Sequence, residues 1–183
     1  MSKADLHYLF KLFKQTLMRM PVSDAHDLWH MAMEFFSSQR AYFDQILDIL
    51  GNVISVGGGG RGGATLACTA LDWVLQNQGV RCAREMYNRL LALPGPSLDF
   101  YKHCITFESQ LAAVGCEEAA QNMCKLYDSA LKLYEQNIEL WLDYCAEELK
   151  AGRSDAASSV YWRARKTLKD STAFIEAFQS LQN

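Results

Sequence analysis

The stretch ELWLDYCAEELKAGRSDAASSVYWRARKTL, residues 139–168, decides the fold of this chain. It contains two runs in which apolar residues recur three or four positions apart, with Gly152 between them. Apolar residues at this spacing lie on one face of a helix, and a glycine often follows the last residue of a helix. The stretch therefore predicts two successive helices, 137–151 and 154–169.

The same apolar spacing continues through the rest of the chain. It predicts seven more helices, at 5–20, 24–37, 40–54, 65–78, 80–93, 97–114 and 117–134. No run alternates apolar and polar residues for long enough to predict a strand. The sequence therefore predicts an all-α fold.

An aromatic ring recurs at regular intervals, in every second predicted helix. Each ring is followed four positions later by leucine or a long side chain, as Tyr127 is by Leu131. The five rings, at intervals of 30, 44, 40 and 34 residues, are Phe13, Phe43, Tyr87, Tyr127 and Tyr161. Two helices per unit at such a period are typical of an α-solenoid, in which stacked helix pairs bury one another's apolar faces.

We expect the recurring rings to be structural anchors between helices. The first helix of three pairs also has an aromatic residue near its start, and the full set of expected anchors is Trp29, Phe43, Tyr87, Tyr101, Tyr127, Trp141, Tyr144 and Tyr161. One such ring buries roughly 150–250 Å². At about 25 cal/mol per Å² this contributes at most about 4–6 kcal/mol, so packing outweighs exposed ion pairs, which contribute about 0–1 kcal/mol each.

The expected organisation is one array of helix pairs over residues 1–183. Its parts are the second helix of a truncated pair at 5–20, a pair at 24–54, a flexible Gly-rich loop at 55–64, pairs at 65–93, 97–134 and 137–169, and a C-terminal tail at 170–183.

Two segments carry a more specific motif. In each, an aromatic residue is followed three positions later by a residue expected to point inward, and four positions after that by an acid. The residues are Tyr101, Cys104 and Glu108 in LDFYKHCITFE, and Trp141, Tyr144 and Glu148 in ELWLDYCAEEL. This motif resembles the half-a-TPR (HAT) repeat, whereas the W-x-x-L-G-x-x-Y helix of ordinary TPR is absent. The resemblance implies that Glu108 and Glu148 are structural; the first repeat departs from the motif, with Phe36 at the position of the acid.

Residues 79–170 strongly resemble the C-terminal repeats of the U3 small nucleolar RNA-associated protein 6 family, and residues 20–56 do so more weakly. The resemblance implies a non-catalytic scaffold of the nucleus and nucleolus, which binds protein subunits of the small-subunit processome during pre-18S ribosomal RNA maturation. Contact with pre-rRNA or U3 snoRNA is expected to be indirect. The family has earlier repeats, so we expect this chain to be a fragment, a short isoform or a truncated gene model. The alternative is a HAT scaffold of pre-mRNA processing, in splicing or 3′-end cleavage.

The patterns that suggest chemistry are incomplete. GGGGRGG, residues 57–63, lacks the Lys-Ser/Thr pair of a phosphate-binding loop and is interpreted as flexible. His26 and His30 lie one helical turn apart, but a metal site needs three or four ligands. Cys104 stands where Tyr144 does in the next repeat, which predicts packing. We expect no catalytic residue, cofactor, metal or small-molecule substrate.

Charge argues against a nucleic-acid surface covering the whole protein. The chain has 18 Lys plus Arg and 21 Asp plus Glu, and no apolar run approaches the roughly 18–20 residues that cross a bilayer. One basic strip, at 153–169, comprises Arg153, Arg163, Arg165, Lys166 and Lys169. Two interpretations stay open for it: a solvated helix face, or a direct contact with RNA phosphates or an acidic partner.

Overall fold

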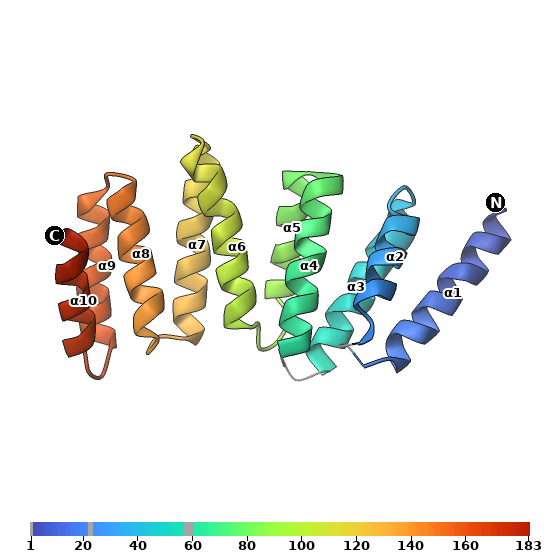
Figure 1. Cartoon of the computed structure of the whole chain (residues 1–183), viewed down its shortest axis with the longest axis horizontal. Coiled ribbons are helices and arrows are strands. Elements are labelled where there is room, and N and C mark those ends of the chain that lie inside the picture. Colours follow the sequence, from blue (N-terminus) through green and yellow to red (C-terminus); the bar gives the residue numbers. More distant parts are fainter. Residues whose placement is uncertain (1, 22–23, 57–60) are drawn as a thin grey trace. The chain divides into compact units, whose positions relative to one another are not determined.

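The computed structural model describes residues 2–21, 24–56 and 61–183. All regular secondary structure in these ranges is helical, which confirms the predicted all-α fold. The chain divides into two compact units, residues 1–100 and 101–183, each treated by itself below. Figure 1 shows helices that run up and down within each unit, joined by short connections.

The first unit contains five complete helices and the first turn of a sixth. They are α1 (Lys3–Arg19), α2 (His26–Phe36), α3 (Arg40–Val56), α4 (Arg61–Gln78), α5 (Val80–Leu91) and the beginning of α6 (Leu98–Ala113). The pairs α2–α3 and α4–α5 pack together, and α1 packs on both α2 and α3. Phe10 and Leu17 of α1 are buried, so this helix is held by the unit's core.

The second unit contains the rest of α6 and four further helices. These are α7 (Glu117–Leu133), α8 (Ile138–Lys150), α9 (Ser154–Thr167) and α10 (Thr172–Gln182). The most extensive packing in this unit joins α8 to α9, and α10 packs against α8.

Glycines end two of these helices in the way that the sequence indicates. Gly115 and Gly152 adopt φ values of 96° and 76°, a region that residues with a Cβ atom rarely enter. After α8, the Gly152 amide donates to the Leu149 carbonyl and the Arg153 amide to the Glu148 carbonyl, at 3.0 and 2.9 Å. This is a Schellman motif, which satisfies carbonyls at the helix end and turns the chain toward α9.

The ends of the Gly-rich segment are helical where the structure describes them. Of the loop expected at 55–64, residues 55–56 belong to α3 and residues 61–64 to α4, while residues 57–60 lie outside the described residues. Glycine weakens a helix by about 1 kcal/mol relative to alanine. Burial of Ala64, Leu66 and Ala67 on the same helix opposes that cost.

The C-terminal segment differs from the expected tail. Residues 172–182 form α10, whose Phe174 and Phe178 are buried. A helix this short is marginal by itself and depends on tertiary packing. Two phenylalanines four residues apart provide that packing, because they lie on the same face of the helix.

Candidate functional site

The expected anchors lie mostly in the interior of the two units. Seven of the eight are buried, namely Trp29, Phe43, Tyr87, Tyr101, Tyr127, Trp141 and Tyr144, and Tyr161 is partly exposed. Trp141 makes two specific contacts. Its Nε1 donates to the Glu135 carbonyl at 2.8 Å, and the Arg163 guanidinium lies 5.6 Å from the centre of its ring. The Nε1 atom of Trp29 is also buried, but it has no hydrogen-bond partner among the described residues.

Rings of the second helices pack against the helix that follows. Tyr127 of α7 stacks on Tyr144 of α8, with ring centres 4.6 Å apart and planes within 6°. Tyr161 of α9 stacks in the same way on Phe178 of α10, at 4.4 Å. In the first unit, Phe43 of α3 lies 5.8 Å from Trp73 of α4. Equivalent rings thus occupy equivalent positions between successive helices.

The two buried acids occupy matching positions in α6 and α8. Glu108 and Glu148 are 0% and 2% exposed. The Glu148 carboxylate accepts hydrogen bonds from the Arg153 Nε at 2.7 Å, the Arg153 Nη2 at 3.2 Å and the Cys124 Sγ at 3.1 Å. Burial, followed by the hydrogen bond that the thiol donates to Glu148, raises the pKa of the Cys124 thiol to about 11. These groups join α7, α8 and the start of α9.

Phe36 replaces the acid in the first repeat, and it builds an aromatic cluster instead. Its ring is fully buried and lies 5.6 Å from Phe10, 5.9 Å from Phe13 and 5.5 Å from Tyr42. The cluster joins α1, α2 and α3, so an apolar contact takes the place of the charged one.

Several members of the basic strip predicted at 153–169 have partners within the chain. Arg153 is bonded to Glu148, Arg163 forms an ion pair with Asp128 at 3.0 Å, and the Arg165 guanidinium lies 4.9 Å from the Trp162 ring. Lys166 and Lys169 are exposed and have no ion pair in the described part of the chain. Three of the five residues thus have partners within the chain, and the two lysines have no ion pair with a described residue.

The histidines and Cys104 differ in burial: His30 is exposed and His26 partly exposed, whereas Cys104 lies in the interior. His30 contacts Trp73 edge-on, at 6.4 Å between ring centres, and Cys104 is fully buried. Among the described residues, no three His, Cys, Asp or Glu side chains are grouped to hold a metal. None of the described helices is both long enough and apolar enough to cross a membrane.

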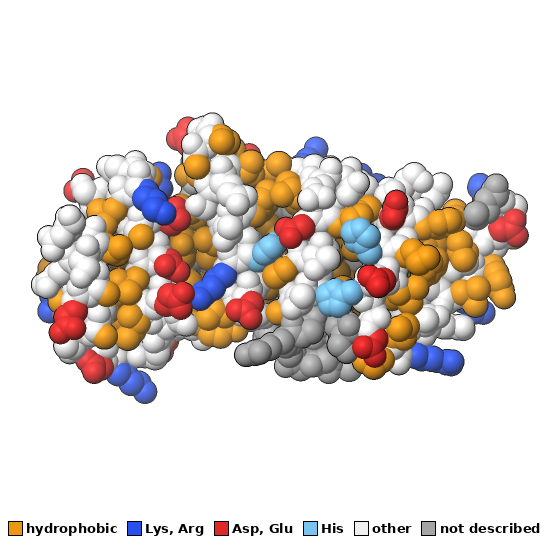
Figure 2. Space-filling view, in the orientation of Figure 1, with side chains coloured by type: hydrophobic (Ala, Val, Ile, Leu, Met, Phe, Trp, Pro, Cys, Tyr) orange, Lys and Arg blue, Asp and Glu red, His pale blue; other side chains and the backbone are white. Residues whose placement is uncertain are grey.

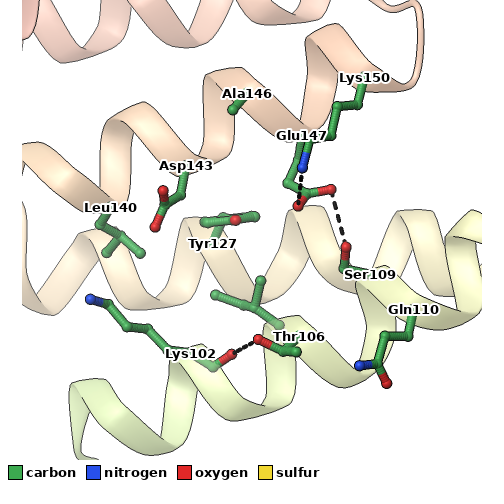
Figure 3. Close-up of a pocket in the computed structure, with 11 residues that line it drawn as sticks. Lys102, Thr106, Ser109, Gln110, Tyr127, Leu140, Asp143, Ala146, Glu147 and Lys150 are labelled. Atoms are coloured by element: carbon green, nitrogen blue, oxygen red, sulfur yellow. Dashed lines mark hydrogen bonds and ion pairs between the residues drawn. The ribbon is translucent and has the colours of Figure 1, made fainter. Parts of the chain in front are cut away.

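A groove of about 300 Å³ opens between α6, α7 and α8 in the second unit (Figure 3). Charged and polar side chains surround it: Lys102, Thr106, Ser109, Gln110, Asp143, Glu147 and Lys150. Apolar groups from Ile105, Leu140 and Ala146 and the Tyr127 ring complete its walls. This groove is not predicted from the sequence, although the spacing of Glu139, Asp143 and Glu147 indicates an acidic stripe along α8.

The first unit has an exposed apolar hollow. Leu9 and Phe13 of α1 line it together with Met31, Glu34 and Phe35 of α2, around a volume of about 450 Å³. Figure 2 shows hydrophobic side chains gathered over these two helices. Met31 and Phe35 are 58% and 40% exposed, which is unusual for large apolar side chains gathered in one place.

Comparison with known proteins identifies the family. The family model described as U3 small nucleolar RNA-associated protein 6 C-terminal matches residues 5–168, most of the chain. The chain belongs to this family. The U3 small nucleolar RNA-associated protein 6 homolog of Homo sapiens is 34% identical to it over 122 residues, which cover 65% of this chain.

The match spans only 19% of the length of that human relative. The U3 small nucleolar RNA-associated protein 6 family match covers all the helices from α1 to α9, apart from the first two residues of α1. It therefore includes the buried acids, the stacked rings and the groove, whereas α10 lies beyond it.

Proposed function

We propose that this chain is a non-catalytic helical-repeat scaffold that acts in nucleolar pre-18S ribosomal RNA processing. Its role is to hold protein subunits of the small-subunit processome together during small ribosomal subunit biogenesis. The observation that carries this proposal is the match of residues 5–168 to the U3 small nucleolar RNA-associated protein 6 C-terminal family. The proposed role is that of a whole protein of this family, whereas the match to the human relative spans only 19% of that relative's length.

The use of the polar groups supports a role in binding rather than catalysis. The buried Glu148 is fully engaged with Arg153 and Cys124, and burial raises the pKa of the Cys145 thiol to about 12. A catalytic thiol is normally activated by a lowered pKa. Stacked rings and the ion pair of the buried Glu148 with Arg153 instead hold helices together, and such a frame can present a groove to a partner protein.

Contact with pre-rRNA or U3 snoRNA is proposed to be indirect. Arg153, Arg163 and Arg165 are occupied within the chain, and the two remaining lysines of the strip neutralise at most two phosphates. Because salt-dependent affinity grows with the number of phosphates neutralised, such a surface binds RNA weakly. Filter binding of the purified chain to U3 snoRNA should therefore show little affinity even at low salt. Tight binding at low salt would instead favour direct RNA contact, if the double variant Lys166→Glu/Lys169→Glu lost it.

Affinity purification of the tagged full-length protein tests the proposal. We expect processome proteins and U3 snoRNA to be recovered from nucleolar extract, and the proteins to remain bound after ribonuclease treatment. The same recovery is expected with Lys166→Glu/Lys169→Glu as a matched surface control. Splicing or 3′-end cleavage factors, recovered without pre-ribosomal components, would instead support the pre-mRNA alternative.

A further inference from the structure

We propose that the groove between α6, α7 and α8 binds a lysine or arginine side chain from an extended segment of a partner protein. The inference rests on the proposed scaffold function, because a scaffold needs sites for partner segments. It goes further by giving the place of one site and the chemistry of its occupant.

The size and the walls of the groove suit one long side chain. Its volume of about 300 Å³ is at the lower end of the range for ligand pockets, about 300–1,000 Å³. Ile105, Leu140 and Ala146 line its walls, and the first two are buried. Lysine and arginine place their methylene stems on such apolar surface and keep the charged group among polar ones.

The charges along α8 leave one carboxylate available. Glu139 and Glu147 already have partners: Lys102 lies 3.4 Å from Glu139 Oε1, and the Ser109 hydroxyl donates to Glu147 Oε2 at 3.1 Å. Lys150 lies 3.9 Å from the other oxygen of Glu147. Asp143, between these two acids on the same helix face, has no hydrogen bond or ion pair with any described residue. The groove is lined by two lysines and two acids; both lysines have acidic partners, whereas the carboxylate of Asp143 has none among the described residues.

Tyr127 provides an independent indication of a ligand. It is 3% exposed, and its hydroxyl makes no hydrogen bond with the described residues although it lies at the groove (Figure 3). The hydroxyl is the part of this side chain that faces the groove, and its oxygen can accept a hydrogen bond from a donor that enters there. The ammonium of lysine and the guanidinium of arginine are such donors.

The local electrostatics favour a cation over an anion. The pKa of Asp143 is raised, first by its partial removal from water and then by Glu139, despite the opposing effect of Lys102. The pKa of Tyr127 is also raised, first by burial and then by the charges of Glu147 and Asp143. Neighbouring carboxylates therefore contribute to both upward shifts, even with two lysines at the rim.

The test is an NMR titration of the full chain with short capped peptides. Ac-Gly-Arg-Gly-NH₂ and Ac-Gly-Lys-Gly-NH₂ are the cationic probes, the citrulline counterpart is the neutral isostere, and Ac-Gly-Asp-Gly-NH₂ is the anionic one. We expect the cationic probes to shift amide signals of α6, α7 and α8 around the groove. The neutral and anionic probes should shift them far less.

Matched variants separate the groove from general charge. Asp143→Asn should weaken binding of the cationic probes about two- to fivefold, the effect of losing one exposed ion pair. Tyr127→Phe keeps the stacked ring and should also weaken binding. Asp155→Asn makes the same charge change at an exposed position in the first turn of α9 and should leave binding unchanged. Far-ultraviolet circular dichroism checks that all three variants fold.

Several results would overturn the inference. They are equal binding of the citrulline peptide, preference for the anionic peptide, no shifts at the groove with any probe, and an unchanged affinity in folded Asp143→Asn. Such a failure is distinct from failure of the scaffold proposal. Recovery of processome proteins by purification, together with a groove that binds no cation, would place the partner contacts elsewhere on the chain.

Discussion

Trp141 and Trp162 form a natural pair for testing whether buried rings hold the second unit together. Trp141 is 3% exposed, between the Glu135 carbonyl and the Arg163 guanidinium. Trp162 is 55% exposed, with Arg165 above its ring. The two residues have the same side chain and differ in burial, so replacing each with alanine isolates the contribution of burial.

The expected losses of stability differ by several kcal/mol. Replacing a buried tryptophan with alanine costs about 3–5 kcal/mol, and the hydrogen bond from Nε1 accounts for about 1 kcal/mol of this. Trp162→Ala removes an exposed cation–π contact of about 0.5–1 kcal/mol and little buried area. Trp141→Ala should therefore lower the free energy of unfolding by at least about 2 kcal/mol more than Trp162→Ala does.

Urea unfolding of the full chain, followed by far-ultraviolet circular dichroism, measures both losses. Because the chain has two compact units, the transition that includes α8 is the one expected to shift in Trp141→Ala. Trp141→Phe should lie between wild type and alanine, since it keeps a ring but loses the donor. Equal losses in the two alanine variants, or a loss below about 1 kcal/mol in Trp141→Ala, would refute the structural role assigned to the ring.

Three further predictions concern the same unit. Arg153→Met should lower the free energy of unfolding, measured by urea titration, by about 2–4 kcal/mol, because it leaves the buried Glu148 carboxylate without its charged partner. Adding Glu148→Gln to this variant should recover part of the lost stability. Gly152→Ala should cost about 1–2 kcal/mol in the same assay, because its φ of 76° is strained for any residue with a Cβ atom, and a fully stable variant would contradict this. Burial raises the pKa of Cys124 from 9.0 to about 11 and that of Cys145 from 9.0 to about 12. The folded state then holds its thiol protons to higher pH than the unfolded state, so stability present below pH 9 is lost as the pH rises toward 11–12. In thermal melts, the double variant Cys124→Ala/Cys145→Ala should lose less stability at high pH than the wild type does. The same pH dependence in both proteins would count against the raised thiol pKa values.

Much of the fold is predictable because helical periodicity is a local property. The apolar spacing in 139–168 locates α8 and α9 to within a residue or two, and Gly152 marks the turn between them. Tyr127 and Tyr161 also share an environment, since each stacks on the helix that follows. A ring at the same position in successive helix pairs contacts the equivalent neighbouring helix. The period of the sequence therefore predicts this contact.

The C-terminal segment was less accessible to such reasoning. Phe174 and Phe178 are the two buried residues of α10. Although apolar residues recur at helical spacing in this segment, a helix of only eleven residues is marginal by itself. The helix forms because those rings reach Tyr161 of α9, at 5.7 and 4.4 Å. Its stability comes from contacts with residues that precede it in the chain, which local propensity does not register.

The amino-acid sequence by itself determined the helices, the spacing of the rings and the family of this protein, because each of these depends on residues close together along the chain. Only the tertiary structure decided which polar groups are free. Arg163 is paired with Asp128, 35 positions earlier, whereas Asp143 and the Tyr127 hydroxyl have no hydrogen-bond or ion-pair partner among the described residues. Hydrogen bonds and ion pairs act over a few ångströms in space, so their presence depends on how separate helices pack.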